Sequence, residues 1–183
     1  MDPWQNVKTI NGFNADEIIS ALQKEIRRGE EENAIFLALE MVKTSDSLEK
    51  YLWQRLIIIS VEDVGFGDVF APVLIKTLKD TVETLDSKNL ERELFAVHAV
   101  RYLSACKKDR TSDEMLNLLN RFTEQTDKLP TIPKYAIDMH TKKGIQEGKD
   151  FNHFLKEGAT ILNVSDQYNE IYKQKIIEIL NKI

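Results

Sequence analysis

The sequence predicts an all-α protein, folded as a single-domain bundle of about eight to nine helices. Three observations support this fold class. Apolar residues recur at helical spacing along most of the 183 residues, and no stretch alternates with the period of a β-strand. Only 7 glycines and 4 prolines interrupt the chain, which is sparse for a β protein. A hydrophobic fraction of 42% with 30% charged residues is typical of a soluble globular protein that buries a core.

Two amphipathic helices are expected before the most apolar part of the chain. Residues 1–13 form a short lead, after which Asn14 offers a cap for a helix over residues 15–28. Gly29 ends that helix, and three acids open a second helix over residues 30–42, where they complement its dipole. The apolar stripe of the first helix consists of Ile18, Ile19, Ala21, Leu22 and Ile26.

Residues 52–68 form the stretch around which the rest of the chain is organised. The most apolar run, residues 56–59, is followed by the acids Glu62 and Asp63 and then by two glycines. A run that is apolar on every side and stops at glycines predicts a central helix, over residues 48–61, followed by a sharp turn. Three consecutive isoleucines also fit a buried strand, but no neighbouring segment offers a strand partner.

Six further helices follow, and two prolines divide them into two groups. Pro130 and Pro133 bias the residues before them away from helix and mark residues 129–133 as a linker. We therefore predict a helical core domain over residues 14–128 and a C-terminal helical extension, over residues 129–183, packed on that core. The six predicted helices cover residues 69–85, 90–106, 111–126, 134–146, 152–157 and 165–183.

Charge and cysteine content argue against several classes of protein. The net charge of −5 and the pI of about 5.3 disfavour a broadly basic surface for nucleic acids. The single cysteine, Cys106, cannot form an internal disulfide, so we expect a reducing, cytoplasmic location. No signal peptide is recognisable, and no run approaches the roughly 18 apolar residues that a membrane span needs. Met1 and the short lead favour a natural short protein.

The sequence predicts no enzyme, no catalytic residue and no cofactor. The motifs GxxxxGKS/T, GxSxG and HExxH are absent, and Cys106 lacks a neighbouring histidine, which favours a packed thiol over a nucleophile. His98 is expected to be a hydrogen-bonded structural histidine. A metal-dependent helical hydrolase is a third hypothesis, although the spacing supplies no ligand pattern. Its metal would require His98, His140 and His153 to converge with Asp138, Glu157 or Glu62.

The acid pair Glu62 and Asp63 is the first candidate site. Two carboxylates can work as an acid–base or metal pair, but on adjacent helical positions they point about 100° apart. We therefore favour a structural role, in which they cap backbone amides or pair with an arginine.

The basic segment 140–149 is the second candidate site. Its lysines, histidine and two glycines predict either contact with nucleic-acid phosphates or a helix C-terminus, which prefers the same residues. Phe151 and Phe154 follow with helical spacing and are expected to pack in a core rather than stack on bases. The candidate nucleic-acid contacts are His140, Lys142, Lys143 and Lys149.

The stretches ADEIISALQKEIRRGEEENAIFLALEMV and LWQRLIIISVEDVGFGD together resemble a known protein region. They are similar to the C-terminal region of the AAA+ family that includes replication-associated recombination protein A and Werner helicase-interacting protein (MgsA-like). The likeness is strong over residues 14–68, and residues 129–154 resemble a diverged later segment of that region. The positions that carry it are residues 19–24, Ile26, Arg27, Ala34, residues 36–38, Arg55, Leu56, residues 60–65 and Asp68.

The resemblance implies an all-α domain like the clamp-loader C-terminal collar, through which subunits assemble into a tetramer. It carries no catalytic residue, and no nucleotide-binding motif of the family's ATPase core occurs in this sequence. The leading hypothesis is a non-enzymatic oligomerisation or docking module that binds copies of itself or a replication or repair ATPase. The alternative is an accessory protein of replication or repair that contacts nucleic acid through the basic segment. The expected structural signature consists of Arg55, Ser60, Glu62, Asp63, Gly65 and Asp68.

Overall fold

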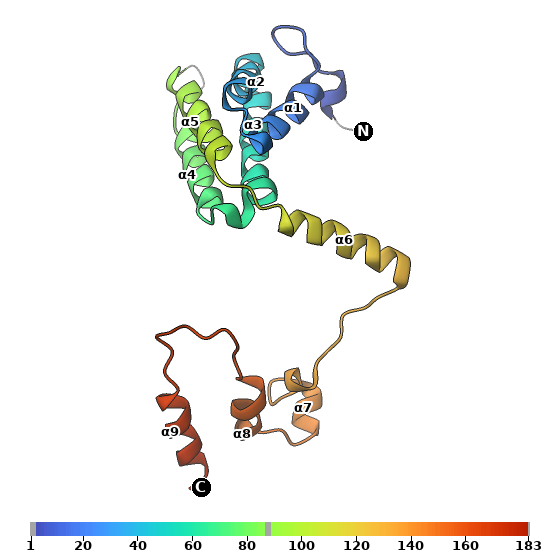
Figure 1. The fold of residues 1–183 in the computed structure, drawn as a ribbon, viewed down its shortest axis with the longest axis vertical. Coiled ribbons are helices and arrows are strands. Elements are labelled where there is room, and N and C mark those ends of the chain that lie inside the picture. The colour runs from blue at the N-terminus through green and yellow to red at the C-terminus, as the bar shows by residue number, and fades with distance from the viewer. Residues whose placement is uncertain (1–2, 87–88, 183) are drawn as a thin grey trace. The chain divides into compact units, whose positions relative to one another are not determined.

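The computed structural model describes residues 3–86 and 89–182 (Figure 1). Within these residues all regular elements are helical apart from one isolated antiparallel bridge between Lys8 and Asn14, which confirms the all-α prediction. The chain forms two compact units, Met1–Thr126 and Asp127–Ile183. The division falls two residues before the predicted one, and packing of the second unit on the first stays a prediction.

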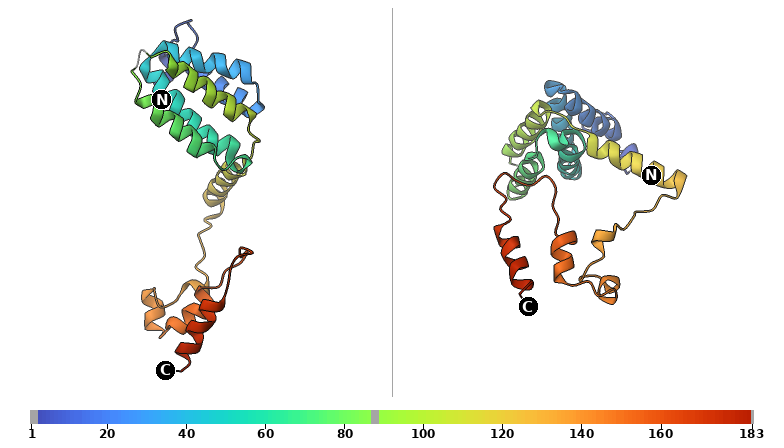
Figure 2. Two further views of the ribbon diagram at one scale, coloured as in Figure 1. Left: turned by 90° about the vertical axis from the view of Figure 1, so that its left-hand side faces the viewer. Right: turned by 60° about the horizontal axis from the view of Figure 1, so that its bottom comes forward.

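The first unit contains a bundle of five helices and a sixth that leaves it (Figures 1 and 2). The helix predicted to be central, α3, contacts each of the other four helices of the bundle. Its apolar residues and those of its neighbours form one core, in which Leu22, Met41, Leu56 and Leu103 are fully buried. The six helices are α1 (Ala15–Arg28), α2 (Glu31–Thr44), α3 (Asp46–Ile59), α4 (Ala71–Glu83), α5 (Glu91–Ala105) and α6 (Thr111–Thr126).

The ends of the first three helices follow from local chemistry. Gly29 adopts a left-handed φ of 80° and ends α1, as the sequence predicted, because glycine enters this region without a steric penalty. Ser45 caps α3 by accepting a hydrogen bond of 3.2 Å from the backbone N–H of Leu48.

The α3 helix ends earlier than predicted, because its backbone widens into a π-helical turn, Ser60–Val64. A 3₁₀ turn, Gly65–Gly67, then reverses the chain. Gly65 has a φ of 52°, and a Cβ atom at this position would lie 2.2 Å from the carbonyl oxygen of Asp109. The Asp109 N–H in turn donates to the carbonyl oxygens of Asp63 at 3.0 Å and Val64 at 3.1 Å. The segment before α6 therefore crosses the corner at a distance that only glycine permits.

The second unit is built from short helices. Its elements are a 3₁₀ turn (Lys134–Ala136), α7 (Lys142–Gln146), α8 (Phe151–His153), a π-helical turn (Phe154–Gly158) and α9 (Ile171–Leu180). Leu155 is the buried hydrophobic residue in the described part of this unit. None of the helices in either described unit is long and apolar enough to cross a membrane.

Two predicted helices of the second unit were wrong in extent. A single helix over residues 134–146 does not form, because the Asp138 carboxylate accepts from the His140 N–H at 2.9 Å and turns the chain. Thr141 then caps α7 by accepting from the Gly144 N–H at 3.0 Å. The last helix begins at Ile171 rather than at residue 165, and its predicted end at residue 183 lies outside the described residues.

Candidate functional site: a carboxylate cluster and an exposed helix

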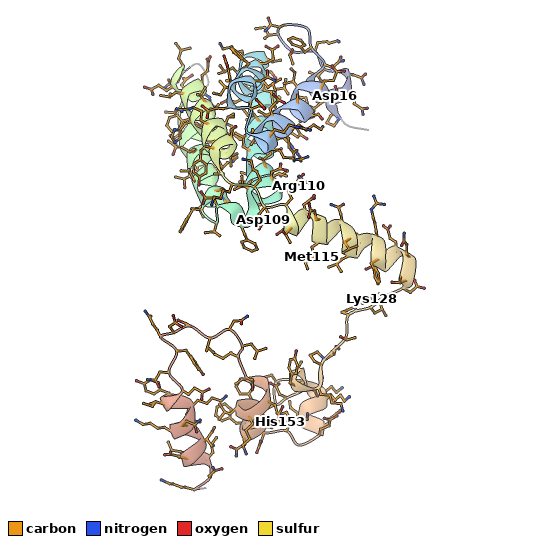
Figure 3. The ribbon with its side chains drawn as sticks, viewed as in Figure 1. Asp16, Asp109, Arg110, Met115, Lys128 and His153 are labelled. Carbon is orange, nitrogen blue, oxygen red and sulfur yellow. The ribbon has the colours of Figure 1, made fainter. Side chains whose placement is uncertain are left out.

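The carboxylate of Asp63 lies in the π-helical turn that follows α3 and has no exposed surface. It accepts hydrogen bonds from Arg27 Nε at 2.5 Å, from Arg110 Nη1 at 2.5 Å and from Gln23 Nε2 at 3.0 Å. Arg27 and Gln23 come from α1, whereas Arg110 directly precedes α6 (Figure 3). A buried carboxylate is tolerated only when charge and hydrogen bonds compensate for its lost hydration, and here two guanidinium groups do so.

The neighbouring acid, Glu62, binds the same side chains while remaining partly exposed. It accepts from Gln23 at 2.8 Å, from Arg27 at 3.2 Å and from Arg110 at 3.3 Å. Although they occupy adjacent positions in the sequence, the two carboxylates converge on the same donors, and each guanidinium group binds both. We call Gln23, Arg27, Glu62, Asp63 and Arg110 the carboxylate cluster. The cluster joins α1, the end of the α3 segment and the start of α6. Because its two acids are already paired with arginines, we assign it a structural role.

Arg55 lies beside this cluster without touching its acids. Its Nη2 donates to the side-chain oxygen of Gln23, so Arg55 contacts the cluster through Gln23, while the acids pair with Arg27 and Arg110. Arg55 precedes the two acids by about two helical turns, so its side chain lies too far along the helix axis to reach them.

Sequence reasoning did not assign Gln23, Arg27 or Arg110 to the site, although Gln23 and Arg27 lie among the positions that carry the family resemblance. They lie 35 to 48 positions from the acids they bind, so no local spacing reveals the pairing. Their positions at helix ends were the available signals for pairing with acids at another helix end: Arg27 belongs to the last turn of α1, and Arg110 directly precedes α6.

Ser60 and Asp68 have structural contacts on either side of the glycine corner. Ser60 is fully buried and donates to the carbonyl oxygen of Ile57 at 2.6 Å. Asp68 accepts from the Tyr102 hydroxyl at 2.6 Å and from the Phe70 N–H at 3.0 Å, and these bonds lower the pKa of its carboxyl. Burial raises the pKa of the nearby Cys106 thiol, which keeps it protonated and agrees with a packed rather than a nucleophilic cysteine.

The basic segment lies in the second unit, and acids lie among its bases. Lys143 Nζ is 3.9 Å and Lys149 Nζ 3.8 Å from the carboxylate of Glu147. His140 Nδ1 lies 3.2 Å from the carboxylate of Asp138, and the His140 ring meets Phe154 edge to face. Lys142 is exposed. Nucleic-acid contact by these residues therefore stays a prediction.

The predicted histidine sites are not brought together. Among residues 3–86 and 89–182, no three His, Cys, Asp or Glu side chains gather as a group that could hold a metal ion. His98 is exposed on α5 rather than packed beside the core, so the expected structural role of this histidine was wrong. Phe151 and Phe154 stack with their ring centroids 6.0 Å apart, with Phe151 partly exposed.

The most unusual surface of the first unit is α6, which has no buried residue. Its large apolar side chains expose between 43% and 62% of their surface. Met115, Leu118, Leu119 and Phe122 follow the i, i+3, i+4, i+7 spacing of one helical face, with Leu116 at its edge, a pattern that in a globular protein contacts a partner. We call this face the α6 stripe, and its residues are Met115, Leu116, Leu118, Leu119 and Phe122 (Figure 3 labels Met115).

A groove of about 380 Å³ joins the α6 stripe to the end of α3. Its apolar lining comes from Ile57, Ile58 and Val61 on one side and Leu116 on the other. A second hollow of about 180 Å³ shares Val61 and continues to Phe66. Exposed apolar side chains outside α6 line the two hollows: Ile58, Val61, Phe66 and Val69.

Fold and contacts together define a helical bundle domain fixed by a buried ion-pair network, with one amphipathic helix presented at its end. The family model described as MgsA AAA+ ATPase C terminal matches residues 29–175, and the chain therefore belongs to that family. It is a helical accessory domain of an AAA+ ATPase family, as the resemblance implied. The match includes residues 129–154, which resemble a diverged segment of the family, and begins after α1. No curated protein matches the sequence.

Proposed function

We propose that this chain is a non-enzymatic module that self-associates through the α6 stripe and serves a replication- or recombination-associated AAA+ ATPase. The observation that carries the proposal is α6 itself, a helix of 16 residues with an apolar face and no buried residue. Monomeric proteins rarely expose a continuous apolar patch unless it binds a partner. Membership of the family of AAA+ ATPase C-terminal domains supports an accessory role over a catalytic one.

The magnitude of the available burial favours a modest affinity. Covering the exposed half of a Leu, Met or Phe side chain contributes on the order of 1 kcal/mol. Five such residues in each of two copies give on the order of 10 kcal/mol, against an association cost of about 4–15 kcal/mol. The free energy gained by burying α6 alone is therefore close to the cost of association. Burial of the apolar surface at the end of α3 would add to the favourable side.

Light scattering coupled to size exclusion tests the proposal. The wild-type chain at tens of micromolar should have a mass of more than one copy. Leu119→Glu places a charge in the middle of the α6 stripe and should give a monomer, because burying an unpaired carboxylate costs several kcal/mol.

Asn120→Glu is the matched control, because this exposed residue lies on the polar face of the same helix. It adds the same charge at the next position and should leave the mass unchanged. Circular dichroism should show both variants as helical as the wild type. A wild-type chain that stays monomeric at 100 μM, a concentration where contacts of about 5 kcal/mol begin to register, would remove the proposal.

A further inference from the structure

We infer that two copies of this chain pair their α6 helices antiparallel about a two-fold axis, with Glu114 of each copy opposite Arg121 of the other. The inference rests on the proposed self-association and specifies its partner and geometry. It follows from where the charged residues lie relative to the α6 stripe.

Glu114 and Arg121 lie along the same edge of the stripe. They are seven residues apart, so on a helix of 3.6 residues per turn they differ by only about 20° in direction. Both lie roughly 90–110° from the centre of the stripe, the flanking position from which long side chains reach across a helix pair. Both are exposed, and neither forms an ion pair with another described residue.

The opposite edge of the stripe carries no charge. Ser112, Leu116 and Thr123 lie there, roughly 70–110° from the centre in the other direction. Ser112 and Leu116 also line the groove toward α3, so this edge faces the bundle of its own chain. The charged edge is therefore the one directed away from the bundle.

Symmetry then separates the two possible orientations. A two-fold axis along the helices, which makes a parallel pair, sets the charged edge of one copy against the uncharged edge of the other. A two-fold axis perpendicular to the helices, which makes an antiparallel pair, sets the two charged edges against each other with their ends exchanged. Only the antiparallel pair brings Glu114 to Arg121, and it does so twice.

The apolar and charged patterns also agree on the position of the axis. The midpoint between Glu114 and Arg121 falls between Asn117 and Leu118. Met115, Leu118, Leu119 and Phe122 are centred between Leu118 and Leu119, one residue away. A single register therefore pairs the charges and covers the apolar residues together.

Charge exchange tests the arrangement by sedimentation equilibrium. Glu114→Arg and Arg121→Glu each place like charges opposite one another twice per pair, and each should raise the dissociation constant about tenfold. The double variant E114R/R121E restores both attractions with the partners exchanged and should return the constant to within about threefold of wild type. Glu124→Arg, on the back of the helix, is the matched control and should change little.

Cross-linking tests the direction of the pair independently. In a Cys106→Ser background, Leu118→Cys lies near the axis and should form a disulfide-linked pair under mild oxidation. Gln125→Cys lies on the same edge near the helix end, about 20 Å from its copy in an antiparallel pair, and should not cross-link. In a parallel pair each position would face the opposite edge of the partner helix, so Leu118→Cys would cross-link no better than Gln125→Cys.

The outcomes keep the two proposals apart. A monomeric wild-type chain overturns both. A wild-type chain that associates, with no rescue in E114R/R121E or with cross-links at Gln125→Cys, overturns the antiparallel pairing and leaves self-association standing.

Discussion

Within the residues that the structure describes, each of the two units buries one aspartate, and the two units compensate for its lost hydration in different ways. Asp63 in the first unit is bound by two arginines and a glutamine that are distant in sequence. Asp138 in the second unit, 7% exposed, binds its own neighbour, His140, through a backbone N–H at 2.9 Å and a ring nitrogen at 3.2 Å. The first carboxylate therefore joins separate helices, whereas the second shapes one turn.

The difference extends to the cores. The first unit buries a continuous set of apolar residues from five helices, while Leu155 is the buried hydrophobic of the second unit within the described residues. Damage to the carboxylate cluster should therefore be global within the first unit, and damage at Asp138 should remain local. Three predictions, ordered by the size of their expected effect, test this comparison.

Asp63→Asn should have the largest effect. It leaves two arginines without their buried acceptor, and breaking a buried ion pair on one side costs about 3–5 kcal/mol. For a unit of this size that lowers the Tm by roughly 10 °C or more, measurable by circular dichroism or calorimetry.

Glu62→Gln is the control for Asp63→Asn, because Glu62 is partly exposed and shares the same donors. It should cost about 1 kcal/mol or less. Equal loss of stability in the two variants would contradict the special role assigned to the buried acid.

Gly65→Ala should rank second. The new methyl group would meet the Asp109 carbonyl at 2.2 Å in a backbone conformation with a φ of 52°. Strain and displacement together should cost about 2–4 kcal/mol in the free energy of unfolding.

Gly12→Ala separates the two causes, since Gly12 also has a positive φ, 84°, but nothing lies within 4 Å of its Cβ position. It should cost about 1 kcal/mol, from conformation alone. Denaturant unfolding of the two variants compares them directly, and equal losses would show that the close approach of Asp109 is unimportant.

Asp138 should produce the smallest effect, confined to low pH. The backbone N–H of His140, with its ring, lowers the pKa of the Asp138 carboxyl from its ordinary 3.8. Because the folded pKa is depressed, the carboxylate stabilises the turn above pH 3.8, and this contribution disappears as the pH falls through the lowered value.

An amide NMR titration measures this effect. The His140 amide should titrate below pH 3.8, while amides of the first unit should not follow this step. Asp138→Asn should abolish the transition. A titration midpoint above the ordinary pKa of 3.8 would mean that folding raises the pKa of Asp138, and it would refute a stabilising role for this carboxylate.

Sequence reasoning located the helices best where the chain carries explicit end signals. The bounds of α1 and α6 match the prediction, because Gly29 and the Thr111 region mark them. The helix over residues 134–146 was wrong, because Asp138 competes for a backbone N–H and no helical pattern registers that competition.

The carboxylate cluster was predictable only in part. Glu62 and Asp63 stood out by their place after the apolar run, and a structural role paired with arginine was the favoured interpretation. Which arginines they bind depends on how α1 and the start of α6 meet α3, and that is a tertiary property. The exposure of α6 could not be predicted either, because an amphipathic helix has the same sequence pattern whether its apolar face is buried or exposed.

The crossing of Asp109 over Gly65 couples the folding of the bundle to the direction of α6, the helix proposed to mediate self-association. The α6 helix begins two residues after Asp109, so the direction in which that helix leaves the bundle is set by the backbone bonds of Asp109 to Asp63 and Val64. A copy whose bundle has opened loses that direction. Under the proposed self-association, the assembly would select for correctly folded subunits, and a destabilised copy would be left out before it could impair its neighbours.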